Sequence, residues 1–228
     1  MIDQDWERWR MVQTQIADRG VRDERVLQAM RTVPREAFVA DHLADQAYRD
    51  HPLPIDEGQT ISQPYVVAWM AEALEPQPGD RVLEIGAGSG YAAAVLSRVV
   101  DEVYTVERFP ALARQAGRRL ERLGYLNVLV RAGDGTLGWP ELAPYDGIVV
   151  AAGGPEVPVP LLDQLAPDGR LVIPVGPRPD LQTLVRVTRL RAGRFREEDL
   201  GAVRFVPLVG ARGWSEDAWE MERAGWRR

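Results

Sequence analysis

The stretch of residues 80–107 decides the fold of this chain, and it opens Asp80-Arg-Val-Leu-Glu-Ile-Gly-Ala-Gly-Ser-Gly-Tyr91. An apolar strand at Arg81–Ile85 runs into a turn that contains three glycines. A helical pattern follows over Tyr91–Val99, and a second apolar strand at Glu102–Val106 ends at an acid, Glu107. Strand, helix and strand in this order predict a βαβ unit with a glycine-rich first turn.

The glycines and the acid are what a nucleotide-like ligand requires. Gly86, Gly88 and Gly90 let the backbone approach a ligand closely, and the start of the following helix offers free N–H groups. Glu107 follows Gly86 by about 20 residues, where an acid accepts hydrogen bonds from a ribose diol. The unit therefore predicts a ligand with a ribose.

The spacing favours S-adenosylmethionine (SAM) over a dinucleotide. The dinucleotide pattern has a third small residue five positions after the first glycine, and here that position is Tyr91. Glu84, just before Gly86, is an acid that suits a ligand with a cationic amino-acid end and no pyrophosphate. The alternative is a tight turn without a ligand, but the flanking strands, Glu84 and Glu107 favour a SAM site.

Composition excludes several kinds of chemistry. The 228 residues include no Cys, which rules out disulfides and thiolate catalysis, and only two histidines, His42 and His51, so we expect no metal site. All 28 basic residues are Arg, which removes lysine chemistry. A net charge of −6 argues against nucleic acid as a partner. With no long apolar run and a charged N-terminal stretch, we expect no membrane span, no signal peptide and a cytoplasmic protein.

Residues 1–50 carry helical patterns. The first apolar face is formed by Trp9, Val12 and Ile16, and Asp23 is expected to cap a second helix. We interpret this region as a helical cap that packs on an α/β domain, in preference to direct ligand contact, because apolar faces at helical spacing usually belong to a core.

Residues 48–65 read Tyr-Arg-Asp-His-Pro-Leu-Pro-Ile-Asp-Glu-Gly-Gln-Thr-Ile-Ser-Gln-Pro-Tyr. Three prolines, a glycine and clustered hydroxyls predict irregular backbone ahead of a helix at Val66–Leu74. Irregular segments beside a ligand-binding domain often carry binding residues. The alternative is a linker, although linkers are seldom so rich in apolar side chains.

The following elements continue the α/β alternation. A helix from Pro110 is expected to end at Gly124, and a strand at Val128–Ala132 runs into Gly133-Asp134-Gly135. Asp134 could approach an adenine ring there, and an ordinary turn explains it equally well. Beyond it we expect a strand at Asp146–Ala151, a helix at Val159–Leu165 and a strand at Arg170–Pro174.

The last third departs from this alternation. Leu181–Leu190 and Gly201–Val209 are predicted strands joined through the charged segment Arg191–Asp199. No helical pattern separates them, so we expect antiparallel pairing at one edge of the sheet. The predicted fold is an α/β, Rossmann-like SAM-dependent methyltransferase sandwich with an N-terminal helical cap and antiparallel C-terminal strands.

Several motifs in one order resemble the protein-L-isoaspartate O-methyltransferase family over residues from about 11 to 210. Gly58–Tyr65 resembles the segment that this family, unlike other SAM methyltransferases, has ahead of its glycine loop. The other matching segments are Arg81–Tyr91, Tyr104–Arg108, Gly133–Gly135 with Trp139-Pro140, Pro144–Asp146, Pro155–Pro158 and Val203–Leu208.

The resemblance implies a SAM-dependent repair enzyme. It would methylate the L-isoaspartyl carboxylates of damaged proteins and peptides, leaving S-adenosyl-L-homocysteine, and D-aspartyl acceptance stays open. Ser62 corresponds to the catalytic hydroxyl. The expected SAM contacts, with Glu84 added from the spacing, are Gln59, Thr60, Ile61, Ser62, Glu84, Gly86, Gly88, Gly90, Glu107, Asp134 and Gly135. The expected peptide contacts are Leu53, Pro54, Ile55, Asp56, Val206, Pro207 and Leu208.

On this basis residues 1–210 would form one domain. It would consist of the cap (1–50), a substrate and catalytic loop (51–65) and an α/β core (66–210), with a charged tail at 211–228. We expect a monomer. Position 56 departs from the family pattern, because this chain has Asp where we expect Gly, and the tail beyond Trp214 matches nothing in the pattern.

The residues suit an acceptor that needs no base. A carboxylate has a pKa of about 4, so it is already ionised and nucleophilic at pH 7. Ser62 would orient it by a hydrogen bond and would not attack, since no partner base is evident. The alternative for Ser62 is a helix N-cap, and it could do both.

Three other functions remain open. A methyltransferase for one dedicated peptide would account for Asp56 and the unmatched tail. A methyltransferase acting on RNA or a small molecule is disfavoured by the Thr60-Ile61-Ser62 segment. A SAM-binding interaction module without activity would use the acidic surface and the Trp-bearing tail.

Overall fold

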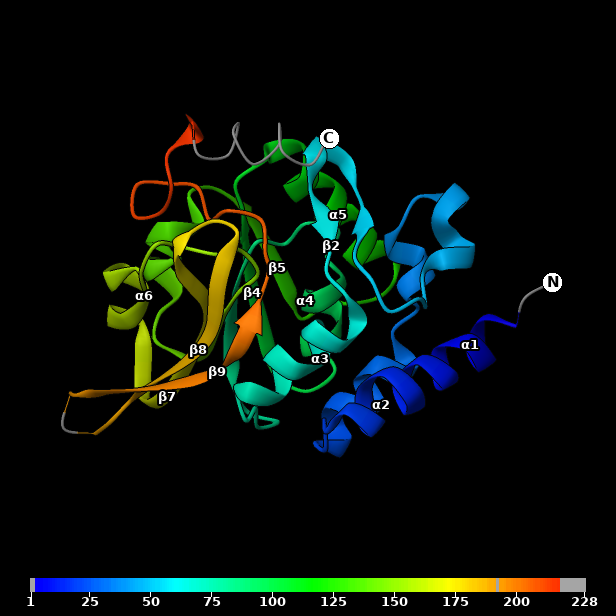
Figure 1. Cartoon of the computed structure of the whole chain (residues 1–228), viewed down its shortest axis with the longest axis horizontal. Coiled ribbons are helices and arrows are strands. Elements are labelled where there is room, and N and C mark those ends of the chain that lie inside the picture. The colour runs from blue at the N-terminus through cyan, green and yellow to red at the C-terminus, as the bar shows by residue number, and fades with distance from the viewer. Residues whose placement is uncertain (1–2, 192, 218–228) are drawn as a thin grey trace.

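A mixed sheet of seven strands forms the centre of the computed structural model, which describes residues 3–191 and 193–217 (Figure 1). The strand order is β5-β4-β3-β6-β7-β8-β9. The strands are β3 (Arg81–Ile85), β4 (Glu102–Glu107), β5 (Val128–Ala132), β6 (Tyr145–Val150), β7 (Leu165–Arg178), β8 (Leu181–Arg189) and β9 (Phe195–Val203). Pairing is parallel from β5 to β7 and antiparallel from β7 to β9. The predicted α/β class with antiparallel C-terminal strands is confirmed.

Helices cover both faces of the sheet. One buried cluster joins one face to α1 (Gln4–Met11), α2 (Glu24–Thr32), α3 (Pro64–Ala73), α4 (Tyr91–Leu96) and α5 (Pro110–Arg122). A second cluster joins the other face to α6 (Val159–Asp163). Because side chains alternate along a strand, Val82 and Val103 face the first cluster and Leu83 and Tyr104 the second. The same alternation places the side chains at positions 84, 105 and 107 on the α4 side, where the site lies.

The N-terminal cap packs as expected, with one correction. Asp23 caps α2 by accepting from the backbone N–H groups of Arg25 and Val26. Val12 and Ile16 are fully buried in the short π-helix after α1. Trp9 was expected in the same apolar face, but its side chain is 54% exposed. The apolar face that is buried runs through Met11 instead, because the helix turns Trp9 toward solvent.

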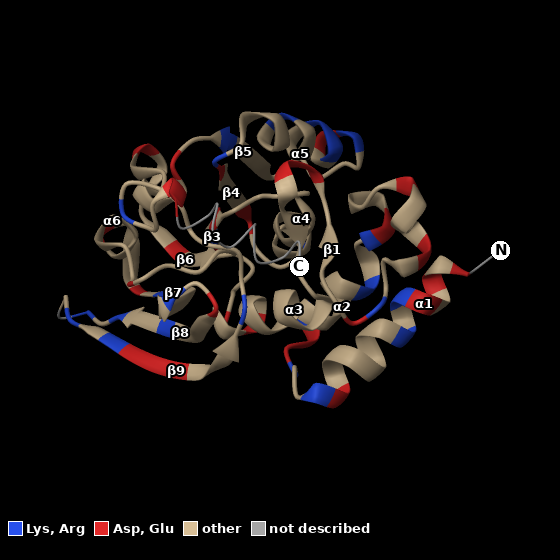
Figure 2. Ribbon diagram, turned by 45° about the horizontal axis from the view of Figure 1, so that its top comes forward, with Lys and Arg blue, Asp and Glu red and all other residues tan. Residues whose placement is uncertain are grey.

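The antiparallel edge also differs from the prediction. Residues 195–199 of the expected charged connection belong to β9, which continues to Val203, and residues beyond Val203 leave the sheet. All of β9 is at least partly exposed, and its acidic residues line the sheet edge (Figure 2). A solvent-facing edge strand needs no apolar face and gains from charge, which discourages further pairing.

The segment ahead of α3 is more ordered than its sequence suggests. Leu53–Pro54 (β1) and Thr60–Ile61 (β2) pair as a short antiparallel hairpin around a 3₁₀ turn at Asp56–Gly58. Of the expected charged tail, residues 218–228 lie outside the described part of the chain. Within the described part, no helix combines the length and apolar character needed to cross a membrane, and no cluster of possible metal ligands occurs.

Candidate active site

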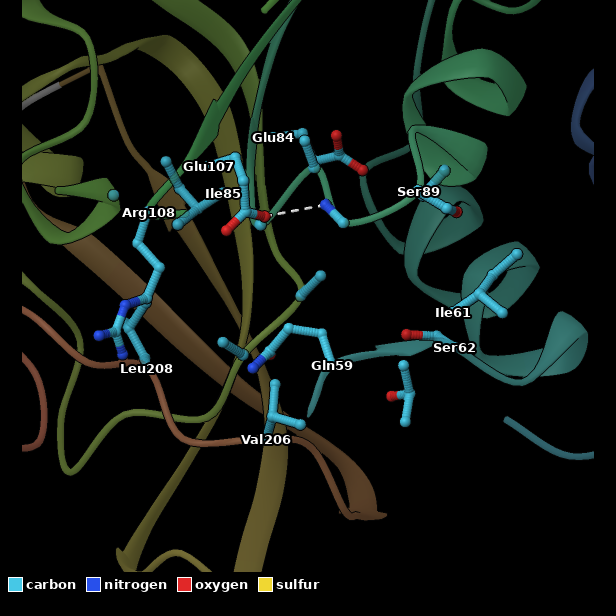
Figure 3. Close-up of a pocket in the computed structure, with 18 of the residues that line it drawn as sticks. Gln59, Ile61, Ser62, Glu84, Ile85, Ser89, Glu107, Arg108, Val206 and Leu208 are labelled. Atoms are coloured by element: carbon cyan, nitrogen blue, oxygen red, sulfur yellow. Dashed lines mark hydrogen bonds between the residues drawn. The ribbon is translucent and has the colours of Figure 1, made fainter. Parts of the chain in front are cut away.

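A pocket opens at the carboxyl ends of β3, β4 and β6, where open α/β sheets bind ligands (Figure 3). Its empty volume is about 780 Å³, including space open to solvent. Its walls are Gln59–Ser62, Val67, Glu84–Ser89, Tyr91, Ala92, Val106–Arg108, Gly135, Ala151, Ala152 and Val206–Val209. Segments far apart in the sequence thus meet in one cavity.

The glycine loop forms one wall of this pocket. Gly88 has a positive φ of 51°, a conformation that glycine adopts without a steric penalty. Its backbone N–H donates to Glu107 Oε2 over 2.9 Å, as Figure 3 shows. The other carboxylate oxygen of Glu107 accepts from the backbone N–H of Phe109 over 3.0 Å. Two backbone donors therefore fix the Glu107 carboxylate, and each oxygen keeps a further lone pair for a ligand.

Glu84 is a buried acid with one unused oxygen. Its Oε2 accepts from the Thr105 hydroxyl over 2.6 Å, while its Oε1 has no hydrogen-bond partner in the described part of the chain. Burial raises the pKa of Glu84 to about 8, and the nearby Glu107 charge adds to the rise. A buried oxygen without a partner is costly unless a ligand supplies a donor. The sequence pattern gave no sign of the Thr105 contact.

Ser62 lies across the pocket from Glu107, at the end of the hairpin (Figure 3). The next residue, Gln63, is the N-cap of α3, and that helix has no side-chain cap. None of the hydrogen bonds among the described residues involves the Ser62 hydroxyl. The alternative that Ser62 caps the helix is therefore wrong, and its hydroxyl is available to a ligand.

The segment Val206–Leu208 forms a further wall. It is fixed by a pair of backbone hydrogen bonds to Gly153, from Gly153 N–H to Val206 C=O and from Leu208 N–H to Gly153 C=O, both 2.8 Å long. Buried Gln182 also bonds to both backbone groups of Phe205. The approach is close, since a Cβ on Gly153 would lie 2.3 Å from Gln182 Nε2. A side chain at position 153 would therefore displace the Gln182 amide from Phe205.

The remaining predicted residues lie outside the pocket lining. Gly90 turns the chain into α4 with φ 89° and packs on α5. Asp134 caps a short 3₁₀ helix and accepts from the N–H of Ala211. Leu53 is buried, at 3% exposure. Residues 54–56 instead line a neighbouring hollow between the cap, the hairpin and α5.

Several lining residues were not predicted. Arg108 directly follows Glu107, and its guanidinium pairs with Glu216 over 2.5 Å at the rim. Tyr91 is 1% exposed at the base of α4, and Ser89 belongs to the glycine loop. All three residues lie in segments that resemble the family, Arg81–Tyr91 and Tyr104–Arg108, and this was their sequence signal.

Comparisons with known proteins place the chain in a family. A family model described as "Protein-L-isoaspartate(D-aspartate) O-methyltransferase (PCMT)" matches residues 7–213. A protein-L-isoaspartate O-methyltransferase 2 of Pelobacter propionicus is 64% identical over 212 residues, covering 93% of this chain and 94% of that one. A protein-L-isoaspartate O-methyltransferase 1 of Geotalea uraniireducens is 64% identical over 204 residues, covering 90% and 93%.

Solved structures agree with the sequence comparisons. One of a protein-L-isoaspartate O-methyltransferase superposes with a TM-score of 0.81 at 33% identity, covering 90% of this chain and 67% of that one. One from Plasmodium falciparum, in complex with S-adenosyl-L-homocysteine, superposes with a TM-score of 0.75 at 26% identity, covering 89% and 98%. The chain belongs to the protein-L-isoaspartate(D-aspartate) O-methyltransferase family.

Proposed function

We propose that this protein transfers a methyl group from SAM to the free carboxylate of L-isoaspartyl residues in damaged proteins and peptides. The observation that carries the proposal is one cavity with two chemically different sides. The glycine loop, Glu84 and Glu107 line one side, and Ser62 with Val206–Leu208 lines the other. Methyl transfer needs the donor and the acceptor side by side in one site, which this pocket can supply.

The residues present fit SAM. The unpartnered Oε1 of Glu84 is a buried acceptor that suits an ammonium group. The Glu107 carboxylate, held by two backbone N–H groups, suits the two hydroxyls of a ribose. When bound, SAM supplies a methyl group on a sulfonium cation.

The acceptor side requires positioning and no proton removal. An isoaspartyl carboxylate is ionised at pH 7, because its pKa is about 4. We assign to the Ser62 hydroxyl the role of donating a hydrogen bond that orients this carboxylate. Both histidines lie outside the lining, in agreement with a reaction that needs no general base.

The ester product explains how methylation would lead to repair. The carboxylate oxygen forms a bond to the methyl carbon, and the carbon–sulfur bond breaks. The methyl ester is a better electrophile than the carboxylate, so the neighbouring backbone nitrogen displaces methanol and closes a succinimide. Hydrolysis of the succinimide returns part of the chain to normal aspartate.

The test is transfer of labelled methyl from SAM to a synthetic isoaspartyl peptide. The matched control is the same peptide with a normal Asp linkage. We expect base-labile label on the isoaspartyl peptide and background label on the control. Label on neither peptide would contradict the proposed function, and labelling of a single cellular protein instead would favour a dedicated substrate.

We also propose a cytoplasmic location, because SAM is made and used inside cells. Cell fractionation followed by the same methyl-transfer assay tests this. Activity confined to a membrane or extracellular fraction would contradict it.

A further inference from the structure

One side of α5 forms hydrogen bonds to the β1–β2 hairpin and to the glycine loop. Gln115 Nε2 donates to Asp56 Oδ2 over 3.1 Å, and Arg119 Nη1 donates to the Ser89 carbonyl over 2.7 Å. Residues four apart on a helix lie on one side of it, so a single rigid turn of α5 contacts the hairpin and the glycine loop. The hairpin runs beside this helix in Figure 1. We propose that Gln115 and Arg119 are positioning residues that hold the β1–β2 hairpin, which leads to Ser62, and the glycine loop at a fixed separation. We call the bond from Arg119 to the glycine loop the first arm, or Arg119 arm, and the bond from Gln115 to the hairpin the second arm, or Gln115 arm.

The Arg119 arm fixes the glycine loop. Ser89 is only 5% exposed and lies between two glycines with positive φ. Next to it, Gly90 packs so closely on α5 that a Cβ there would lie 3.2 Å from Leu120 Cδ1. No salt bridge among the described residues involves Arg119, and its guanidinium donates its hydrogen bond to the Ser89 carbonyl. Burial lowers the pKa of Arg119, and the nearby Asp56 charge opposes that shift. A charged donor makes this hydrogen bond stronger than a neutral one.

The Gln115 arm fixes the turn of the hairpin. Asp56 opens the 3₁₀ turn, and the next residue, Glu57, has φ 58°, which is unfavourable for a residue other than glycine. Gln59 N–H donates to Asp56 C=O over 3.1 Å, and β2 then leads to Ser62. Anchoring Asp56 to α5 therefore anchors the strand that ends at the proposed catalytic hydroxyl.

The two hydrogen bonds position the hairpin that leads to Ser62 and the glycine loop, whose proposed ligands must react with each other. Ile55 lies over the glycine loop, since a Cβ on Gly88 would be 3.4 Å from its Cδ1. A small shift of one loop against the other would change how the acceptor approaches the methyl group, and methyl transfer is sensitive to such shifts. Asp56, which stands where we expected glycine, thereby gains a role in anchoring the loop. This inference rests on the proposed function.

Arg119→Leu and Arg119→Lys test the first arm by SAM calorimetry. We expect about tenfold weaker SAM binding in Arg119→Leu, because a charge-assisted hydrogen bond is lost, and partial recovery in Arg119→Lys. Arg118→Leu, an exposed neighbour on α5, is the matched control and should bind SAM as wild type does. Unchanged affinity in a folded Arg119→Leu would overturn this arm.

Gln115→Ala, Asp56→Ala and the double variant test the second arm. Each should lower kcat/KM for an isoaspartyl peptide about three- to tenfold with SAM affinity unchanged, and the double variant should be no worse than either single one. Additive effects, or single effects below twofold, would overturn the second arm.

Hydrogen exchange keeps this test separate from the proposed function. Gln115→Ala and Asp56→Ala should speed exchange of the Gln59 N–H, whatever the substrate is, because the turn loses its anchor. A wild-type protein without methyl transfer would contradict the proposed function only. Unchanged exchange together with unchanged SAM binding in Arg119→Leu would contradict the positioning role.

Discussion

Ser62 and Glu107 lie on opposite sides of the pocket, so their proposed roles can be tested separately (Figure 3). Ser62→Ala removes a hydroxyl that makes no hydrogen bond within the described residues, and stability should hardly change. We expect SAM affinity to be kept and methyl transfer to an isoaspartyl peptide to fall at least tenfold, as orientation by a hydrogen bond is lost. Calorimetry and the labelled-methyl assay measure the two quantities. Equal turnover in both proteins would refute the catalytic role.

Glu107→Ala should show the reverse pattern. Removing the carboxylate takes away the acceptor for a ribose diol and frees the Gly88 N–H. Since a hydrogen bond to a charged group contributes about 1.5–3 kcal/mol, we expect at least tenfold weaker SAM binding. Glu102→Ala, which removes a partly exposed acid at the start of the same strand, is the control. SAM binding as tight as in wild type would rule out the ribose assignment.

Glu84 should make the ligand-free protein less stable as pH rises. In the folded chain its pKa is about 8, whereas in the unfolded chain it ionises near its ordinary value of 4.5. The folded state then holds the extra proton, so this stabilising contribution is complete below about pH 4.5 and is lost as pH rises through about 8. The loss should amount to a few kcal/mol, of the order that such a shift implies.

Urea unfolding of wild type and Glu84→Gln at pH 5, 7 and 8.5 measures this effect. Gln cannot ionise, so the free energy of unfolding of the variant should fall less steeply over this range. Parallel pH profiles would show that Glu84 is ionised in the folded protein.

At the scale of single residues, the sequence predicted the motif residues better than it predicted their side-chain contacts and burial. Spacing and motif order singled out Glu84, Glu107 and Ser62, and all three line the pocket, while their roles stay predictions. The Thr105 partner of Glu84 was missed, since the pairing depends on register between two strands. Trp9 was assigned to the core because periodicity alone does not say where an apolar face ends.

At the scale of elements, Gln182 on β8 connects the antiparallel strands to the pocket wall. Its side-chain amide donates to Phe205 C=O over 3.0 Å and its Oε1 accepts from Phe205 N–H over 2.8 Å. Gln182→Leu should lower the free energy of unfolding by about 2–4 kcal/mol, because it leaves both backbone groups buried without partners. Denaturant unfolding measures the loss.

The same variant should raise KM for the peptide, because the wall at 206–208 follows Phe205 directly. Leu181→Gln, at a neighbouring side chain that is 60% exposed, should change neither quantity. A Gln182→Leu protein with wild-type stability would show that Phe205 finds other partners.

Several strands of the parallel half were predictable, whereas β7 extends beyond the predicted Arg170–Pro174 at both ends and the β9 edge was misplaced. β3 and β5 have the predicted bounds. β3 is a buried parallel strand and reads as an apolar run, whereas β5 is a partly exposed edge strand whose start is marked by Val128, Leu129 and Val130. β9 was placed several residues too late, since an exposed edge strand carries the charges that otherwise mark a loop. The hairpin β1–β2 is too short for a period of two to show in the sequence.

At the scale of the whole molecule, the pocket joins segments from residue 59 to residue 209. Ligand binding should therefore stabilise the folded chain as a unit. A ligand at 100 times its Kd contributes about 2.7 kcal/mol, which raises Tm by roughly 5–10 °C for a chain of this size. Thermal unfolding with and without S-adenosyl-L-homocysteine measures the shift. The shift should be smaller in Glu107→Ala, and no shift in wild type would contradict the assigned pocket.

The hairpin that lies over the glycine loop has a kinetic consequence. Gly88 lies next to Ile55 and the Thr60 carbonyl. The hairpin proposed to bind the peptide therefore also covers the part of the pocket proposed to bind SAM. A peptide seated there would block the way in and out for SAM. We therefore expect an ordered kinetic mechanism in which SAM binds before the peptide and S-adenosyl-L-homocysteine leaves after the methylated peptide. In isotope trapping, labelled SAM bound beforehand and chased with peptide plus excess unlabelled SAM should appear in the ester, and a peptide bound alone should not be captured.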